Sequence, residues 1–363
     1  MARIDSFLRL VVEQQASDLH FHAGNVPIIR HDGDLVPLPF RILSEEETRR
    51  FLFEIMTRDQ RESFERDQEL DFAYVIEGIG RFRVNAFQQS HGPGAVFRII
   101  PARLPTLDEL RLPPSLGKLA LQSHGLVLIT GPTGSGKTTT LAAIIHEINT
   151  SSKRHVITVE DPIEFVHRSK KCLVNQRELG FHTHSFANAL RAALREDPDI
   201  ILVGEMRDLE TIQLALTAAE TGHLVFGTLH TSSAPKTVDR VIDVFPPSQQ
   251  SQIRAQFAES IEAVITQTLL KKKAGDGRVA ALEVMTGTTA IRNLIREGKI
   301  HQIPGTMQVS QKDGMQTMDM ALVDLASRGV VTQEEAQSRS MTPNLFGSGA
   351  FGVGGVAASR ARA

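Results

Sequence analysis

A glycine-rich loop is the feature of this sequence whose residue types and spacing point most directly to chemistry. It lies between an apolar run and a helical pattern, and its residues are Gly131, Pro132, Thr133, Gly134, Ser135, Gly136, Lys137, Thr138 and Thr139. Glycines let backbone N–H groups approach phosphate oxygens, and the helix that follows turns the positive end of its dipole toward them. We expect Lys137 to reach the β- and γ-phosphates and Thr138 to bind Mg²⁺. The loop therefore predicts an enzyme that binds and hydrolyses ATP with Mg²⁺.

A carboxylate, Glu205, follows the apolar run 200–203. In open parallel sheets the carboxyl ends of the strands face the ligand crevice, so we expect Glu205 to orient or deprotonate the attacking water. The alternative is that Glu205 merely ends a strand. P-loop enzymes usually hold magnesium with an Asp at this strand end, but Gly204 occupies that position here. Metal coordination therefore depends on another acid.

Three acids are candidates for that role. Glu160, Asp161 and Glu164 surround Pro162 directly after the apolar run 156–159. A charged loop is usually only solvated, so the group is a stronger candidate than any single member. We expect Glu160 and Asp161 to contact the nucleotide or Mg²⁺, and Glu164 to act in catalysis.

One histidine is a further candidate for the nucleotide site. His223 and His230 flank the apolar run 224–229, and His230, at the expected phosphate end, is a candidate sensor of the γ-phosphate, although both could be packing residues. The pairs with i, i+2 spacing have no evident third ligand, so we interpret them as non-metal; they are His20 with His22 and His182 with His184.

The elements that position these residues follow from apolar patterning. The runs 126–129, 156–159, 200–203 and 224–226 are apolar on successive residues, as in a parallel sheet covered by helices on both faces. Before them, residues 4–12 have helical spacing, and the segments 71–75 and 81–87 alternate like antiparallel strands. The fold class is therefore α/β.

We predict the domain layout from the chain length and from the positions of the prolines. A chain of 363 residues is long for one core, and four prolines between Pro101 and Pro114 predict a linker. The predicted parts are an N-terminal α/β domain over 1–100, the linker over 101–113, an ATPase core over 114–270, a helical region over 271–342 and a disordered Gly-rich tail over 343–363.

Composition narrows the function classes. The net charge is −2, which gives no overall basic field for nucleic acid, and Cys172 is the single cysteine, so no internal disulfide or tetracysteine zinc site can form. No window approaches the roughly 20 apolar residues needed to span a bilayer. We therefore expect a cytoplasmic protein without zinc or bound nucleic acid.

Taken together, these residues resemble the motif set of the secretion-superfamily ATPases, and the likeness runs from about residue 3 to residue 342. The matching segments are Ala16–His20, Gly131–Thr139, Thr158–Phe165, Arg195–Asp199, Gly204–Asp208 and Thr221–Thr231. The resemblance implies a Walker A motif at 131–138, an Asp box at 157–164, an atypical Walker B motif ending in Glu205 and a His box at 221–231. A glycine before Glu205 is normal in that family.

The resemblance also implies an architecture. It consists of a PAS-like N-terminal domain and a RecA-like P-loop ATPase domain with a helical C-terminal extension, assembled as a homohexamer. Arg81, Arg83 and Arg98 match positions that reach the nucleotide across a subunit interface, which makes them candidate catalytic residues; without the resemblance we would interpret them as solvated strand-face charges.

One branch of the family fits best. Ala290–Lys299 is similar to the C-terminal signature of the type IV pilus retraction ATPases, and the chain lacks the extra N-terminal domain and zinc-binding insert of the assembly-type relatives. This implies a motor for pilus retraction and twitching motility, with an inner-membrane pilus platform protein as partner and a peripheral place at that membrane. We expect Ala290–Lys299 to transmit force, with Arg292 and Arg296 as exposed charges.

Two rival functions stay open at this point. RecA-like rings also translocate nucleic acid, although an aromatic content of 5% without Trp argues against a base-stacking channel. A nucleotide-gated scaffold without significant turnover is the second alternative, and Glu205 argues against it.

Overall fold

The computed structural model describes residues 2–31, 33–100, 103–275 and 277–346, which form two compact units. The first comprises Met1–Leu104 with Pro162–Val166, and the second comprises Pro105–Asp161 with the described part of His167–Ala363. The division after Leu104 lies inside the segment that the prolines mark as a linker.

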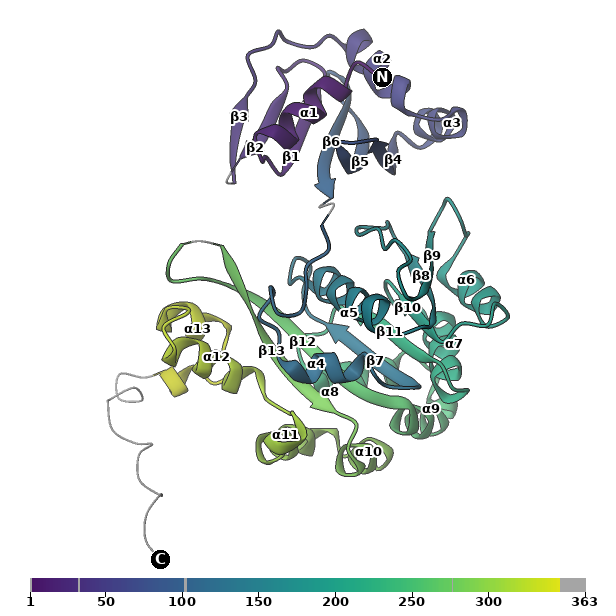
Figure 1. The fold of residues 1–363 in the computed structure, drawn as a ribbon, viewed down its shortest axis with the longest axis vertical. Helices are drawn as coiled ribbons and strands as arrows, with labels where there is room; N and C mark the ends of the chain where they lie inside the picture. Colours follow the sequence, from purple (N-terminus) through teal and green to yellow (C-terminus); the bar gives the residue numbers. More distant parts are fainter. Residues whose placement is uncertain (1, 32, 101–102, 276, 347–363) are drawn as a thin grey trace, which may run out of the picture. The chain divides into compact units, whose positions relative to one another are not determined.

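The first unit is a six-stranded antiparallel sheet with three helices (Figure 1). Its strands, in the spatial order β3-β2-β1-β6-β5-β4, are β1 (Asp18–His22), β2 (Ile28–His31), β3 (Asp34–Pro37), β4 (Glu69–Ile76), β5 (Gly80–Gln89) and β6 (Gly92–Ile100). The helices are α1 (Asp5–Glu13), α2 (Glu45–Ile55) and α3 (Arg58–Asp67). This confirms the predicted N-terminal helix and the two antiparallel strands.

Two of these helices begin at capping boxes that are visible in the sequence. The Ser44 hydroxyl accepts a hydrogen bond from the Glu47 backbone, and the Glu47 carboxylate accepts one from the Ser44 backbone. Thr57 and Gln60 form the same reciprocal pair at the start of α3. Each cap satisfies backbone N–H groups that the first helical turn leaves without partners.

The second unit is built on a seven-stranded sheet of order β13-β12-β7-β11-β10-β8-β9. Its strands are β7 (Gly125–Thr130), β8 (His155–Glu160), β9 (Leu173–Glu178), β10 (Ile200–Val203), β11 (Leu224–Leu229), β12 (Ile261–Lys271) and β13 (Arg278–Thr286). All neighbours are parallel except β12 and β13. The parallel core and the α/β class predicted from the four apolar runs are confirmed.

Helices cover both faces of this sheet. In chain order they are α4 (Pro114–Leu119), α5 (Lys137–Ser151), α6 (Phe186–Ala193), α7 (Leu209–Glu220), α8 (Ala234–Asp243), α9 (Pro247–Ser260), α10 (Thr289–Arg296), α11 (Ile303–Val309), α12 (Met318–Ser327) and α13 (Gln333–Arg339), with short 3₁₀ turns at Ile300–Gln302, Gln311–Asp313 and Pro343–Phe346. Within the described residues, no helix combines the length and apolar character needed to cross a bilayer.

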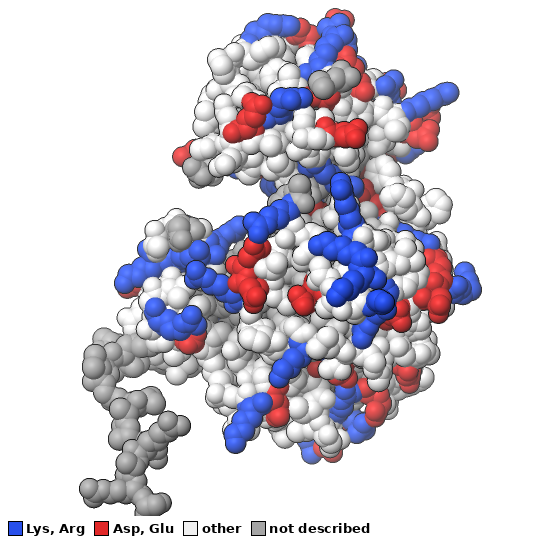
Figure 2. Space-filling model, viewed as in Figure 1, with Lys and Arg blue, Asp and Glu red and all other residues white. Residues whose placement is uncertain are grey.

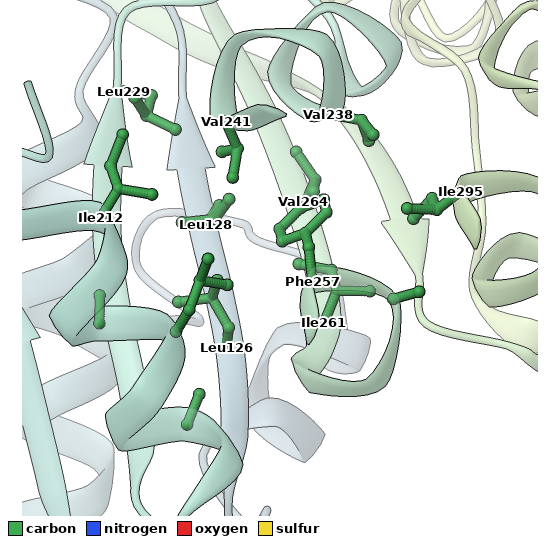
Figure 3. Packing of buried hydrophobic residues seen from close by; sticks show 14 of the residues in the cluster. Leu126, Leu128, Ile212, Leu229, Val238, Val241, Phe257, Ile261, Val264 and Ile295 are labelled. Atoms are coloured by element: carbon green, nitrogen blue, oxygen red, sulfur yellow. The ribbon is translucent and has the colours of Figure 1, made fainter. Parts of the chain in front are cut away.

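Each face of the sheet has its own apolar core, because successive strand residues point to opposite sides. Leu126, Leu128 and Val264 pack against side chains of α7, α8, α9 and α10, as Figure 3 shows for Ile212, Val241 and other labelled residues. Val127 and Ile129 face the opposite core, which α4 and α5 cover. Burial on both faces explains why these strands lack a polar alternation.

Two predictions about the C-terminal part were wrong. Residues 278–286 form strand β13 in the range predicted to be helical, because Val279, Ala281 and Leu282 are buried on two faces and therefore show no strand alternation. In the tail predicted to be disordered, Pro343–Phe346 forms a 3₁₀ turn and Phe346 is buried in a small core with α12 and α13. The rest of that tail, 347–363, lies outside the described residues.

Charge is mixed on the face seen in Figure 2, where both units carry Lys and Arg as well as Asp and Glu side chains.

The prediction that Arg292 is an exposed charge was also wrong. Helix α10 is amphipathic as expected, but the Arg292 guanidinium donates to the carbonyls of Gly287, Ala258 and Glu259 and to the Glu262 carboxylate at 2.6 Å. Two of those carbonyls belong to the last turn of α9, whose negative dipole end the cation offsets. Arg292 thus anchors α10 to the C-terminus of α9.

Arg292→Ala is therefore expected to lower the free energy of unfolding by about 2 kcal/mol or more, because it leaves carbonyls and a partly buried carboxylate without a donor. Arg296→Ala is the matched control: its ion pair with Glu259 is exposed, with 44% and 64% of the two side chains accessible, and should contribute no more than about 0.5 kcal/mol. Urea unfolding of both variants measures the difference. Equal losses would contradict the anchoring role.

Candidate active site

Four neighbouring strands of the second unit deliver the predicted catalytic motifs to one edge of the sheet. In the order β7-β11-β10-β8 they are parallel, so their carboxyl ends lie side by side. The glycine-rich loop follows β7, His230 follows β11, Glu205 lies just beyond β10, and Glu160 ends β8. Motifs that are up to about a hundred residues apart in sequence therefore meet at the crevice where parallel sheets bind ligands.

The loop has the backbone conformation that its glycines predict. Gly131, Gly134 and Gly136 all have positive φ, and α5 begins directly after Gly136. A side chain at Gly131 would collide with the carbonyl of Gln267, and one at Gly136 would lie 2.7 Å from the Gln267 amide nitrogen. Gly131 is thus required by conformation and by space, and Gly136 by conformation.

The loop residues suit a polyphosphate. Among the described residues, the buried Ser135 hydroxyl has no hydrogen-bond partner, and a buried polar atom of this kind usually marks a ligand or water position. Lys137 is buried and donates from Nζ to the carbonyls of Gly131 at 2.8 Å and Pro132 at 3.2 Å. The lysine is therefore already held over the loop, while Thr138 is partly exposed in the first turn of α5.

Glu205 lies in a charged cluster. Its Oε1 is 3.1 Å from His230 Nε2 and also pairs with the Arg207 guanidinium. Burial raises the pKa of Glu205, but Arg207, through its hydrogen bond and charge, together with the charges of His230 and Lys137 outweighs burial, so the pKa lies below its ordinary value. Glu205 is therefore a carboxylate at neutral pH, as a base that accepts a proton from water must be.

The fit of β10 against β8 explains the glycine before Glu205. The Gly204 N–H donates to the Val159 carbonyl at 2.7 Å, and a side chain at 204 would press on the backbone of Val159 and Glu160 at about 3.0 Å. Glycine therefore lets the end of β10 lie close to the acids that follow β8.

The Asp-box acids differ in environment. Glu160 is buried, and its Oε1 accepts hydrogen bonds from Thr158 at 2.6 Å and Gln176 at 2.9 Å. Asp161 is exposed, and its charge raises the pKa of Arg207, so it lies near the Glu205 cluster. Asp161 is thus the more accessible of the two candidate Mg²⁺ ligands.

The remaining predicted site residues belong to the first unit. Glu164 lies in the segment Pro162–Val166, which groups with that unit. Arg83 and Arg98 are cross-strand partners on β5 and β6; Arg83 pairs with Asp71 at 3.8 Å, and Arg98 donates to the buried Asp18 at 2.7 Å. Arg81 lies on β5 opposite Ile100. Their roles at the nucleotide stay predictions.

The two histidine pairs contact residues close to them in the sequence. His20 and His22 lie on β1 with ring centroids 5.7 Å apart. His182 Nδ1 accepts from the Glu178 backbone at 3.0 Å, which supports the turn after β9. Among the described residues, no group of three or more His, Cys, Asp or Glu is placed to hold a metal ion.

Sequence reasoning missed Gln267. This buried residue on β12 donates from Nε2 to the Ser135 carbonyl at 2.7 Å and accepts from the Thr140 hydroxyl at 2.8 Å. It therefore ties the loop to the first turn of α5. Nothing in the sequence signals this, because the contacts join residues more than 120 positions apart.

A pocket of about 270 Å³ adjoins the loop. Gly136, Thr139, Gln267, Leu269 and Arg278 contribute to its wall. Because it lies beside the start of α5 and has apolar and polar walls, it suits the base and ribose of a nucleotide whose phosphates occupy the loop.

Gln267→Leu is expected to weaken ATP binding, because the Ser135 carbonyl and Thr140 hydroxyl lose their buried partners and the loop loses its fixed shape. The Kd for ATP should rise roughly tenfold, in line with about 1–2 kcal/mol for one or two buried hydrogen bonds. Gln308→Leu, an exposed glutamine in α11, is the control. Titration of a fluorescent ATP analogue measures both; an unchanged Kd for Gln267→Leu would exclude this role.

Fold and site together define a class. A parallel sheet with a glycine-rich loop before α5, a carboxylate beyond a neighbouring strand and a histidine 3.1 Å from it constitutes a P-loop ATPase core, here joined to a separate α/β unit.

Comparison with known proteins shows which family of P-loop ATPases this chain resembles. The family model described as type II/IV secretion system protein matches residues 1–349. The type IV pilus retraction ATPase PilT of Pseudomonas aeruginosa is 53% identical over 343 residues, which cover 94% of this chain and 99% of that protein. A twitching motility protein of Neisseria gonorrhoeae is 54% identical over 314 residues, 86% of this chain and 84% of the relative.

A solved structure supports the similarity to pilus retraction ATPases. The crystal structure of the pilus retraction motor PilT with bound ADP matches with a TM-score of 0.89 at 46% identity, covering 95% of this chain and 98% of that one. The chain belongs to the type II/IV secretion system protein family. This confirms the predicted resemblance to the retraction ATPases, the two-domain α/β fold with a RecA-like ATPase domain, and the assignment as an ATP hydrolase that uses ATP and Mg²⁺.

Proposed function

We propose that this chain is the ATPase motor that drives retraction of a type IV pilus. The observation that carries the proposal is full-length similarity, covering 99% of a named retraction ATPase, together with a complete set of motif residues on four adjacent strand ends. A nucleic-acid translocase or a scaffold without turnover would share the loop but not this similarity along both units.

Different residues of the chain take different roles in ATP hydrolysis. Lys137 places a positive charge at the β- and γ-phosphates, and Glu205 accepts the proton of the attacking water. His230, whose Nε2 lies 3.1 Å from Glu205, orients this carboxylate and senses the γ-phosphate. When bound, Mg²⁺ neutralises phosphate charge, and Thr138, Asp161 and Glu160 are the residues that would hold it.

The proposed assembly is a homohexamer. Homologous ATPases of this family form hexamers. In such a ring Arg81, Arg83 and Arg98 of one subunit would stabilise the transition-state charge at the nucleotide of its neighbour, and Glu164 would assist catalysis. The proposed partner is an inner-membrane pilus platform protein, which places the motor at the cytoplasmic side of that membrane.

Mixed rings test the action of the arginines across subunits. Arg98→Ala and Lys137→Ala subunits are each expected to be inactive alone, because each lacks one half of every interface. Mixed rings contain some interfaces with both halves intact, so phosphate release should recover in part. Rings shown by mass spectrometry to be mixed, yet inactive, would refute the trans assignment.

The function itself is tested in the host. Deleting the gene should leave surface pili that no longer retract, with loss of twitching motility. Wild-type protein should restore both, and a Lys137→Ala variant should restore neither. Normal retraction in the deletion strain would contradict the proposal, and absence of pili would indicate an assembly role instead.

A further inference from the structure

Glu283 is a buried carboxylate that the proposed chemistry does not use. It lies on β13 with 7% of its surface exposed, and it accepts two backbone hydrogen bonds. Oε1 accepts from the N–H of Ala234 at 2.6 Å, and Oε2 accepts from the N–H of Met318 at 3.3 Å. These N–H groups begin α8 and α12, so one side chain holds the N-termini of two helices.

Burial makes the charged form of Glu283 costly. It raises the pKa of Glu283 above its ordinary value, and the charge of Asp319 adds to this rise, whereas the two backbone hydrogen bonds oppose it without cancelling it. Two helix N-termini present partial positive charge, which offsets part of the cost of burying a carboxylate. An amide could accept from only one of the two N–H groups, because its NH₂ group would face the other donor.

Helix α8 leads directly to the catalytic cluster. Only Thr231, Ser232 and Ser233 separate Ala234 from His230, whose Nε2 is 3.1 Å from Glu205. This short loop is further fixed to α8 by the hydrogen bond between the Thr231 and Thr237 hydroxyls at 2.7 Å. A shift of the α8 N-terminus therefore displaces His230.

Helix α12 leads to the C-terminal region. Its residues Leu322 and Leu325 pack with Val279 and Ala281 of β13 and with Phe346 in one small core. In Figure 1, α12 and α13 lie beside β13. The segment before α12 is bound to the same strand, because the Gln316 side chain donates to the Leu282 carbonyl at 2.8 Å and Gln316 pairs with Val284.

A polar row connects Glu283 to the phosphate loop as well. Glu283 is paired with Thr266 on β12, and Thr266 is paired with Thr130 on β7, the residue before Gly131. The Thr130 and Thr266 hydroxyls are hydrogen-bonded at 2.8 Å, and both residues are buried. The three side chains thus lie in register on one face of three adjacent strands.

We propose that Glu283 is a positioning residue that couples the nucleotide site to the C-terminal helices by holding α8 and α12 together. The inference rests on ATP occupying the loop as proposed, and it identifies the path by which the state of the γ-phosphate, read at His230, reaches α12. Glu283 takes no part in the proposed hydrolysis chemistry itself.

The test compares Glu283→Ala and Glu283→Gln with Asp319→Asn in full-length protein. Asp319 is a carboxylate in the first turn of α12 that accepts from Ser340 and Met341, so its substitution perturbs the same helix end but removes no hydrogen bond to α8. Hydrogen exchange of the amides at 318–322 is measured with Mg²⁺ and either ADP or the non-hydrolysable analogue AMP-PNP. We expect a difference between the two nucleotides in the wild type and in Asp319→Asn, and none in Glu283→Ala.

Kinetics give an independent measure. Because His230 would be displaced, kcat should fall roughly tenfold in Glu283→Ala and less in Glu283→Gln, with KM nearly unchanged. Gln316→Ala should lower kcat in the wild type but have no further effect in Glu283→Ala, since both act through the same link.

These outcomes separate the inference from the proposed function. A wild type without a nucleotide-dependent difference at 318–322, or a difference that persists in Glu283→Ala, overturns the coupling. A kcat loss equal to that of Asp319→Asn assigns Glu283 to stability alone and also overturns it. Because all measurements use purified protein, a failure of pilus retraction in cells leaves them unaffected.

Discussion

Lys137→Ala is expected to reduce ATP turnover by roughly 10³-fold, at the upper end of the loss seen when one preorganised electrostatic group is removed from a transition state. The substitution removes the only charge that the loop itself carries and the donor to the Gly131 and Pro132 carbonyls. ATP binding should weaken as well, because in the proposed site the lysine already contacts the phosphates in the ground state. Steady-state phosphate release and titration of ATP measure the two effects.

Lys153→Ala is the matched control for this result. Lys153 is exposed just beyond the C-terminus of α5, whereas Lys137 begins that helix. It should retain wild-type turnover. Because Lys137 is buried, circular dichroism and gel filtration must show that the variant is folded and assembled. Wild-type turnover in a folded Lys137→Ala protein would refute the assignment of the loop as the phosphate site.

Glu205→Gln is expected to retain ATP binding while hydrolysis falls about 10²-fold or more. Glutamine keeps the shape of the side chain and can still accept from Arg207 or His230, but its amide cannot take a proton from water. Since Glu205 is ionised in the native protein, the variant removes a base and not a hydrogen-bond donor. Single-turnover phosphate release separates this loss from product release.

Glu210→Gln is the control for Glu205→Gln, because it removes a negative charge close in sequence to Glu205. Glu210 is exposed in the first turn of α7, where it pairs with Arg191, and it should tolerate the change. If ATP binding and hydrolysis fell together in Glu205→Gln, the residue would serve to order the end of β10. Turnover at the wild-type rate would transfer the role of base to Glu164 or another acid.

Local backbone conformation and most of the core strands follow from the sequence alone. The positive φ values of Gly131, Gly134 and Gly136 follow from the residue type, since other residues adopt them at a cost. The four apolar runs of the parallel core were each found as a strand, because burial on both faces leaves a pattern that short segments carry alone. The amphipathic helices α1 and α10 were also found, because an apolar face at helical spacing is visible within each segment alone.

Contacts between distant segments are visible only in the folded structure. Strand β12 enters the sheet next to β7 and brings Gln267 to the glycine-rich loop, and β13, on the other side of β12, brings Glu283 to two helix ends. Arg292 has the same residue type and helical spacing as an exposed charge, yet packing against α9 makes it an anchor. A side chain's burial and partners are properties of the pairing of distant elements, and no local pattern encodes that pairing.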